Sequence, residues 1–121
     1  MSAQVITFTP DMEILEAVHI LVKNRISGGP VLDLRGNLIG MLSEQDCLKV
    51  ALSAAYHSES GGRVEEFMAG EVKTVDADAN IVDVAEIFVN SGYRRLPVVE
   101  GNRLVGQISR HDILRAMEIL H

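Results

Sequence analysis

Apolar residues recur along this chain with two periods, and these periods follow one another in the same order twice. Each half opens with a short β-rich run, residues 5–8 in the first half and 72–75 in the second. Apolar side chains then recur at helical spacing, at Ile14, Leu15, Val18, Leu21 and Val22 and again at Ile81, Val84, Ala85, Phe88 and Val89. Because this spacing places side chains on one face of a helix, both stretches predict amphipathic helices.

A β-hairpin and a second helix complete each half of the predicted pattern. One apolar run begins at Pro30 or Pro97, a tight turn follows, and a second apolar run ends in serine. We expect each proline to begin its strand, where a missing N–H group is tolerated. The closing helices are predicted over about residues 44–56 and 110–120.

The two halves are copies of one unit. Residues 5–33 align with residues 72–100 at an offset of 67, and after a one-residue deletion the match continues at an offset of 66. The identical pairs include Pro30/Pro97, Gly40/Gly106, Ser43/Ser109 and Asp46/Asp112. One copy alone is close to the lower size limit for a core. The sequence therefore predicts an α+β fold in which two β-α-β-β-α repeats pack together with pseudo-two-fold symmetry.

A serine- and glycine-rich segment separates the two copies. It runs from Ser58 to Gly62 and predicts a linker, and apolar residues at helical spacing follow it from Val64 to Met68. We therefore expect a first repeat over residues 1–57, a linker over 58–63 and a second repeat over 64–121.

Composition and charge narrow the class of protein. With 121 residues, 47% of them hydrophobic, the chain has the size and composition of one globular module. Its net charge of −6 argues against binding to nucleic acid phosphates. No uncharged stretch approaches the length needed to cross a membrane. Because an export signal is lacking and Cys47 is the one cysteine, we expect a cytoplasmic protein.

Both hairpins end in a Ser-x-x-Asp sequence at the start of the closing helix. In a capping box, Ser43 or Ser109 accepts the N–H three residues on, while Asp46 or Asp112 reaches back to the serine N–H. The same geometry suits a ligand, because a helix N-terminus attracts phosphate and a carboxylate accepts hydrogen bonds from a ribose diol. The residues alone leave capping and ligand binding as alternatives.

Several of these features recur together in one known family. The tandem organisation, the S-G-G-P-V-L and R-R-L-P-V-V strand starts and the paired serine–aspartate ends resemble a cystathionine β-synthase (CBS) domain pair, or Bateman module, from residue 5 to about 117. The resemblance implies a regulatory module that binds an adenosyl ligand, an adenine nucleotide or S-adenosylmethionine, in clefts between the repeats. No other cofactor is implied.

The resemblance also implies a role for particular side chains. Asp46 and Asp112 would hold ribose hydroxyls, and Ser43 and Ser109 would approach phosphate. Threonines and the segments before the prolines would line the base pockets. The second site would comprise Thr74, Tyr93, Arg94, Arg95, Leu96, Pro97, Ser109, Arg110, His111 and Asp112. The first would comprise Thr7, Ile26, Ser27, Gly28, Gly29, Pro30, Ser43, Gln45 and Asp46.

Charge distinguishes the two candidate sites. The second has arginines and a histidine where the first has small or acidic residues. Since arginine suits bidentate contact with phosphate, we expect a phosphorylated ligand at the second site. Arg94 and Arg95 could instead be ordinary solvated strand residues, and Gly28 and Gly29 could serve packing alone. The first site would be empty or would take a less charged ligand.

Catalytic and metal-binding patterns are lacking in the sequence. The histidines show no metal-ligand spacing, and a single cysteine cannot complete a thiolate zinc site. No base-oriented triad or phosphate-binding glycine motif is present. We therefore expect no enzyme and no metal site, and we expect Cys47 to be a buried small side chain.

The closing helices are apolar on more than one face, which predicts a homodimer interface. Our preferred interpretation is a stand-alone sensor that signals to a separate effector protein, with no nucleic acid or membrane partner. Two alternatives stay open. One is a homodimeric scaffold in which Ser-x-x-Asp only caps helices, and the other is an enzyme that acts on a nucleotide.

Overall fold

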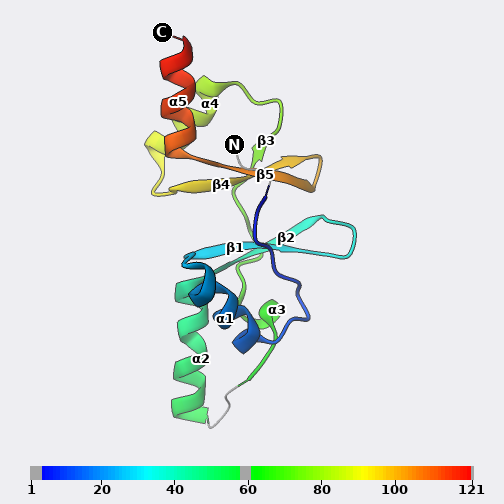
Figure 1. The fold of residues 1–121 in the computed structure, drawn as a ribbon. Helices are drawn as coiled ribbons and strands as arrows, with labels where there is room; N and C mark the ends of the chain where they lie inside the picture. The colour runs from blue at the N-terminus through cyan, green and yellow to red at the C-terminus, as the bar shows by residue number, and fades with distance from the viewer. Residues whose placement is uncertain (1–3, 58–60, 121) are drawn as a thin grey trace. The chain divides into compact units, whose positions relative to one another are not determined.

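The computed structural model describes residues 4–57 and 61–120 as two compact units (Figure 1). One unit comprises Ile6–Val72. The other comprises the chain from Lys73 onward together with Gln4 and Val5. Three residues of the predicted linker, 58–60, lie outside the described residues.

The first unit contains one β-hairpin and three helices. Along the chain these are α1 (Ile14–Asn24), β1 (Gly28–Leu32), β2 (Leu38–Ser43), α2 (Glu44–His57) and α3 (Val64–Phe67). Strands β1 and β2 are antiparallel, α1 packs on α2, and α3 contacts α2 and β2. Figure 1 shows α1 and α2 on one side of the hairpin.

The second unit repeats this order. It contains β3 (Val75–Asp76), α4 (Ile81–Asn90), β4 (Arg95–Glu100), β5 (Arg103–Ser109) and α5 (Arg110–Leu120). The strand order is β3-β4-β5, with β3 parallel and β5 antiparallel to β4, and α4 packs on α5. The helix-hairpin-helix order in both units confirms the predicted α+β class and the predicted helices.

The opening strands are shorter than predicted. In the first unit a single parallel bridge joins Phe8 to Val31, and in the second the strand contains Val75 and Asp76 alone. The Phe8 N–H donates to the Pro30 carbonyl at 2.9 Å, and the Leu32 N–H donates to the Phe8 carbonyl at 2.9 Å. These two bonds tie the start of the unit to the hairpin.

Both prolines lie third in their strands, two residues later than predicted. Pro30 faces Met41, and the Met41 N–H and carbonyl bond to Ala69 at 2.9 Å each, away from Pro30. The β1–β2 ladder therefore needs no N–H from this position. Pro97 has the equivalent place, opposite Gln107. The missing N–H group is thus accommodated by the register of the hairpin.

Helix α3 packs with the first unit. Val64 is fully buried among the core side chains of that unit, and its N–H donates to the Met12 carbonyl at 2.9 Å. The Ile14 N–H donates to the Gly62 carbonyl at 2.9 Å in the same region. The compact unit ends at Val72, whereas the predicted second repeat begins at residue 64. Since the two divide the chain by different criteria, the repeat boundary stays a prediction.

Each unit has its own core. The first is built on Phe8, Ile14, Ala17, Leu21, Val31, Leu42, Val50 and Val64, and the second on Val75, Val84, Phe88, Leu96 and Ile113. Of the predicted apolar faces, Ile14, Leu21, Val84 and Phe88 are buried, whereas Leu15, Val22 and Val89 are exposed. Cys47 packs half-buried against the first core, as expected, and this burial, with nearby Asp46 and Glu44, raises the pKa of its thiol.

Among the residues that the structure describes, no helix is both long and apolar enough to span a bilayer. Within the same residues, no group of three or more histidine, cysteine and acidic side chains is arranged to hold a metal ion.

Core packing in the first unit predicts a large effect of a single truncation. Leu42→Ala removes a side chain that is 0% exposed, so the unfolding free energy should fall by about 2–5 kcal/mol. Leu34→Ala is the matched control, because Leu34 is fully exposed in the hairpin turn. Urea unfolding measures both, and equal midpoints for the two variants would contradict the assignment of the core.

Candidate functional site

Each closing helix begins with a reciprocal pair of serine–aspartate hydrogen bonds. In the first unit the Ser43 N–H donates to Asp46 Oδ2 at 3.0 Å, and the Asp46 N–H donates to Ser43 Oγ at 3.1 Å. In the second unit the same bonds join Ser109 and Asp112 at 2.8 and 3.2 Å. Both Ser-x-x-Asp sequences therefore form the predicted capping boxes.

A third bond in each unit links the closing helix to the loop before the first hairpin strand. The Glu44 N–H donates to the Ser27 carbonyl at 2.9 Å, and the Arg110 N–H donates to the Arg94 carbonyl at 3.2 Å. The loop, the end of the hairpin and the helix start are thus held together. These contacts do not use the amides of Gln45 and His111, the second helical positions.

Strand register decides which side chain faces the capping serine. In the second unit Arg95 pairs directly with Ser109, so a long cation lies beside the cap. In the first unit Gly28 pairs with Ser43. A Cβ atom at Gly28 would collide with the backbone oxygen of Leu42, so this position has no room for a side chain without a backbone shift.

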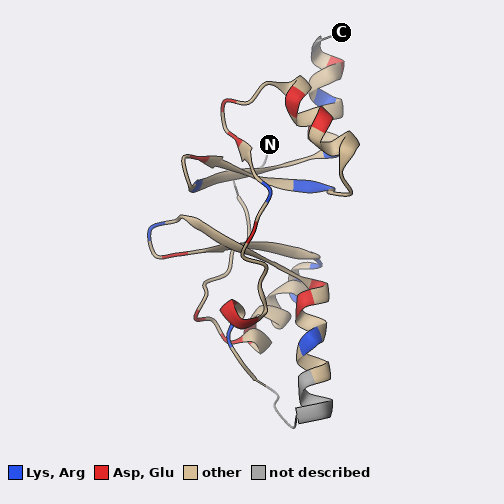
Figure 2. Cartoon of the chain, turned by 180° about the vertical axis from the view of Figure 1, so that it is seen from behind, with Lys and Arg blue, Asp and Glu red and all other residues tan. Residues whose placement is uncertain are grey.

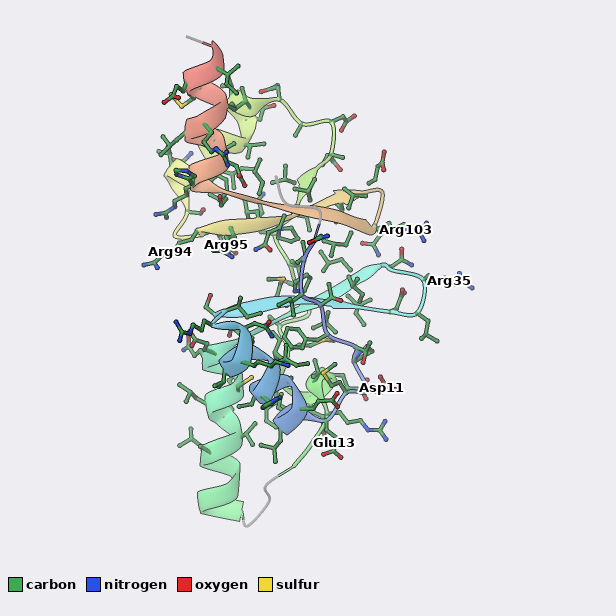
Figure 3. All side chains as sticks on the ribbon, viewed as in Figure 1. Asp11, Glu13, Arg35, Arg94, Arg95 and Arg103 are labelled. Carbon is green, nitrogen blue, oxygen red and sulfur yellow. The ribbon has the colours of Figure 1, made fainter. Side chains whose placement is uncertain are left out.

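Three arginines gather at this end of the second unit. Arg94, Arg95 and Arg110 are all exposed, and Figure 2 shows basic residues where β4 begins. Figure 3 shows Arg94 and Arg95 at the same place, outside the core. Arg110 Nε donates to the Tyr93 carbonyl at 2.8 Å, so this side chain also fixes the loop that carries the other two.

The carboxylates differ in their surroundings. Burial would raise the pKa of Asp112, but the hydrogen bonds from the N–H and hydroxyl of Ser109 act in the opposite sense, and the pKa is lowered overall. In the first unit Lys49 Nζ lies 3.5 Å from Asp46 Oδ1, one turn further along α2. Both carboxylates are half-buried at the surface of their units.

The predicted base-pocket threonines lie beside the opening segments that pair with the first hairpin strand of each unit. Thr7 precedes the Phe8 bridge to Val31, and Thr74 precedes Val75, which pairs with Val98. Both threonines are half-buried. The other predicted residues differ in burial. Gly29, Pro30, Leu96 and Pro97 are buried in the hairpins, and Ile26 and Gly28 are half-buried. Ser27, Gln45, Tyr93 and His111 are exposed.

One residue at the first site was missing from the predicted set. Glu44 has the place that Arg110 has in the second unit, because the N–H groups of both donate to equivalent loop carbonyls. Its alignment with Arg110 at an offset of 66 was the available signal. The first site thus has an acidic side chain where the second has a cation.

Comparison with known proteins identifies a family. A family model described as the CBS domain matches residues 1–53 and 64–119. An uncharacterised 17.7 kDa protein of Acidianus ambivalens is 29% identical over 99% of this chain, which spans 71% of that protein. Inosine-5′-monophosphate dehydrogenase of Methanocaldococcus jannaschii is 30% identical over 92% of this chain, which spans only 21% of that enzyme.

Solved structures share the fold over almost the whole chain. CBSX2 in complex with AMP superposes with a TM-score of 0.80 at 25% identity, covering 98% of this chain and 91% of that one. The CBS domain pair of MJ0100, in complex with 5′-methylthioadenosine and S-adenosyl-L-methionine, has a TM-score of 0.74 at 29% identity, covering 100% of this chain and 94% of that one.

The lowered pKa of Asp112 predicts that the free energy of unfolding depends on pH in the acid range. Its ionised form stabilises the folded chain fully above its ordinary pKa of 3.8, and this contribution is lost as the pH falls through the lowered pKa. Asp112→Asn cannot ionise, so its unfolding free energy should fall less than that of the wild type between about pH 5 and pH 2. Circular dichroism during urea unfolding measures this, with the exposed Asp78→Asn as control. Parallel acid curves for Asp112→Asn and wild type would refute it.

Proposed function

Since this chain belongs to the CBS-domain family, we propose that it is a regulatory module that binds an adenosyl ligand at its Ser-x-x-Asp ends. The second unit binds the phosphorylated ligand in this proposal. The observation that carries it is the register of β4 and β5, which sets Arg95 against Ser109 at a helix start. The effector that receives the signal is a protein.

The chemistry of the second site fits a nucleoside 5′-phosphate. Arg95 and Arg94 offer planar, permanently charged donors, and the start of α5 adds the positive end of a helix dipole. The Ser109 hydroxyl accepts the Asp112 N–H at 3.2 Å, and Arg95 pairs with Ser109 across the hairpin. Asp112 accepts the Ser109 N–H and is the proposed acceptor for a ribose diol, since a carboxylate has about four acceptor sites.

Support for the ligand class comes from the similar structures. CBSX2 holds AMP, and MJ0100 holds 5′-methylthioadenosine and S-adenosyl-L-methionine. All three ligands share an adenosyl group and differ in the 5′ substituent. This favours an adenosine-shaped site in which residues around the serine discriminate between substituents.

One observation favours a second candidate function. The serine–aspartate pairs make complete capping boxes in both units, and a cap alone is a sufficient reason for both residues. In that case the chain is an interaction scaffold that binds no nucleotide. The two proposals differ in what the aspartates contribute when a nucleotide is added.

We also propose that the chain forms a homodimer through its apolar helix faces. Large side chains on both closing helices are exposed, with Leu48 at 67% and Leu114 at 61%. The neighbouring helices add Val22 and Val89, and a groove of about 980 Å³ runs between α1 and α2. Equivalent apolar faces on repeated units suit self-association through a two-fold axis.

The aspartates provide the test between sensor and scaffold. Asp112→Ala and Asp46→Ala remove the same cap, so each should lower ligand-free stability by about 0.5–2 kcal/mol. Only Asp112→Ala should also weaken AMP binding, about tenfold to a hundredfold, because it alone removes the proposed ribose acceptor of the phosphorylated-ligand site. Isothermal titration calorimetry and thermal melting measure the two effects. A wild-type chain that binds no AMP, ADP, ATP or S-adenosylmethionine would leave the scaffold as the function.

Self-association has its own test. Sedimentation equilibrium should give a dimeric mass at micromolar concentration, and Leu114→Glu should shift the mass toward the monomer, because a buried interfacial carboxylate is costly. Leu34→Glu is the control, since Leu34 is fully exposed in a hairpin turn away from the helices. A monomeric mass for the wild type would disprove the proposed dimer, and the proposal on ligand binding would stand.

A further inference from the structure

We infer that the two Ser-x-x-Asp ends recognise adenosyl ligands that differ in the charge of the 5′ substituent: an anionic 5′-phosphate at the second, and an uncharged or sulfonium 5′ substituent at the first. This inference rests on the proposed function. It concerns which adenosyl ligand each unit selects, and it gives the first site an occupant.

The two ends share one geometry, which makes their side chains comparable position by position. The same three hydrogen bonds hold Ser43, Asp46 and Glu44 in one unit and Ser109, Asp112 and Arg110 in the other. A ligand approaching either serine therefore meets the same backbone. Any difference in selectivity has to come from the substituted side chains.

Those substitutions change the sign of the charge. Around Ser109 the second unit has Arg94, Arg95 and Arg110 beside the carboxylate of Asp112. The equivalent positions around Ser43 are Ser27, Gly28 and Glu44, beside Asp46. Lys49 lies near Asp46, but Arg115 has the equivalent place in the second unit, so this pair leaves the contrast unchanged.

Sterics keep the position opposite Ser43 free of a compensating cation. Gly28 is the position that Arg95 has opposite the serine, and a Cβ atom there would meet the Leu42 carbonyl oxygen. Glu44 is exposed at the first residue of α2, where Arg110 stands in α5. A phosphate at Ser43 would face this carboxylate without a counterpart of Arg95 opposite the serine, and Arg25 lines the groove that Ser27 and Glu44 also line. A sulfonium group or amino group would be attracted to the carboxylate.

Ligands of both kinds are known on this fold. AMP carries an anionic 5′ group, S-adenosyl-L-methionine carries a sulfonium cation, and 5′-methylthioadenosine is neutral; the structures of CBSX2 and MJ0100 contain them. The two sites of this chain combine the two chemistries in one molecule. The chain would then respond to a phosphorylated and a sulfur-containing adenosyl ligand independently.

Calorimetry with AMP and with S-adenosylmethionine on the full chain tests the inference. We expect one molecule of each per chain, with binding of one unaffected by saturation with the other. Arg95→Ala should weaken AMP at least tenfold and leave S-adenosylmethionine unchanged. Glu44→Arg should weaken S-adenosylmethionine about tenfold and create a second, weaker AMP site. Glu71→Arg, an equal change of charge at an exposed position of the same unit, is the control and should alter neither.

The outcomes separate this inference from the proposed function. If AMP and S-adenosylmethionine compete for a single site, the charge selectivity is wrong while the proposed nucleotide binding stands. The same holds if Glu44→Arg leaves the binding of both ligands unchanged. Equal effects of Glu44→Arg and Glu71→Arg on ligand binding also overturn the charge selectivity, because the net charge of the chain would then be sufficient to explain the change in affinity. A chain that binds neither ligand overturns both proposals.

Discussion

The reciprocal bond between a serine that ends a hairpin and an aspartate three residues later is the constraint on which each unit depends. A helix start leaves its first N–H groups without helical partners, and a strand end leaves its last groups outside the ladder. The serine–aspartate pair satisfies donors of both kinds, at 2.8 to 3.2 Å in the two units. The loop carbonyl of Ser27 or Arg94 takes another of these donors. The hairpin, the helix and the loop before the hairpin therefore have one fixed geometry.

Most of the architecture was predictable because it repeats local patterns. Helical spacing predicted α1 and α4, and the duplicated proline, glycine, serine and aspartate predicted the hairpins and the capped helices. The short opening strands were overestimated, because a β-rich run does not show how many of its residues find a partner. Phe8 pairs with Val31 and Val75 pairs with Val98, and both partners are more than twenty residues away in the sequence. No local pattern predicts pairings over such separations.

The places of the predicted site residues in the hairpins and at the helix starts were predictable, but their contacts were less so. Register places Arg95 against Ser109, and this follows from the hairpin turn, where a one-residue deletion distinguishes the two copies. The bond from Arg110 to the Tyr93 carbonyl spans seventeen residues and could not be read from spacing. Packing of α3 with the first unit was equally hidden, because Val64 meets Phe8 and Leu42 only after the chain has folded back. Contacts between distant segments are the part that composition and periodicity do not encode.

A cap that is complete before any ligand arrives has a consequence for recognition. The serine hydroxyl and the carboxylate are already oriented by their own bonds, so binding would not have to spend free energy on ordering them. The backbone bonds beside the cap are kept when the side chain changes, since the N–H groups of Glu44 and Arg110 donate to equivalent loop carbonyls, those of Ser27 and Arg94. The exposed side chains at those two positions can therefore differ in charge while these backbone bonds are kept. Divergence of the two copies at Gly28 and Arg95, or at Glu44 and Arg110, thus alters what a unit attracts while its backbone stays the same.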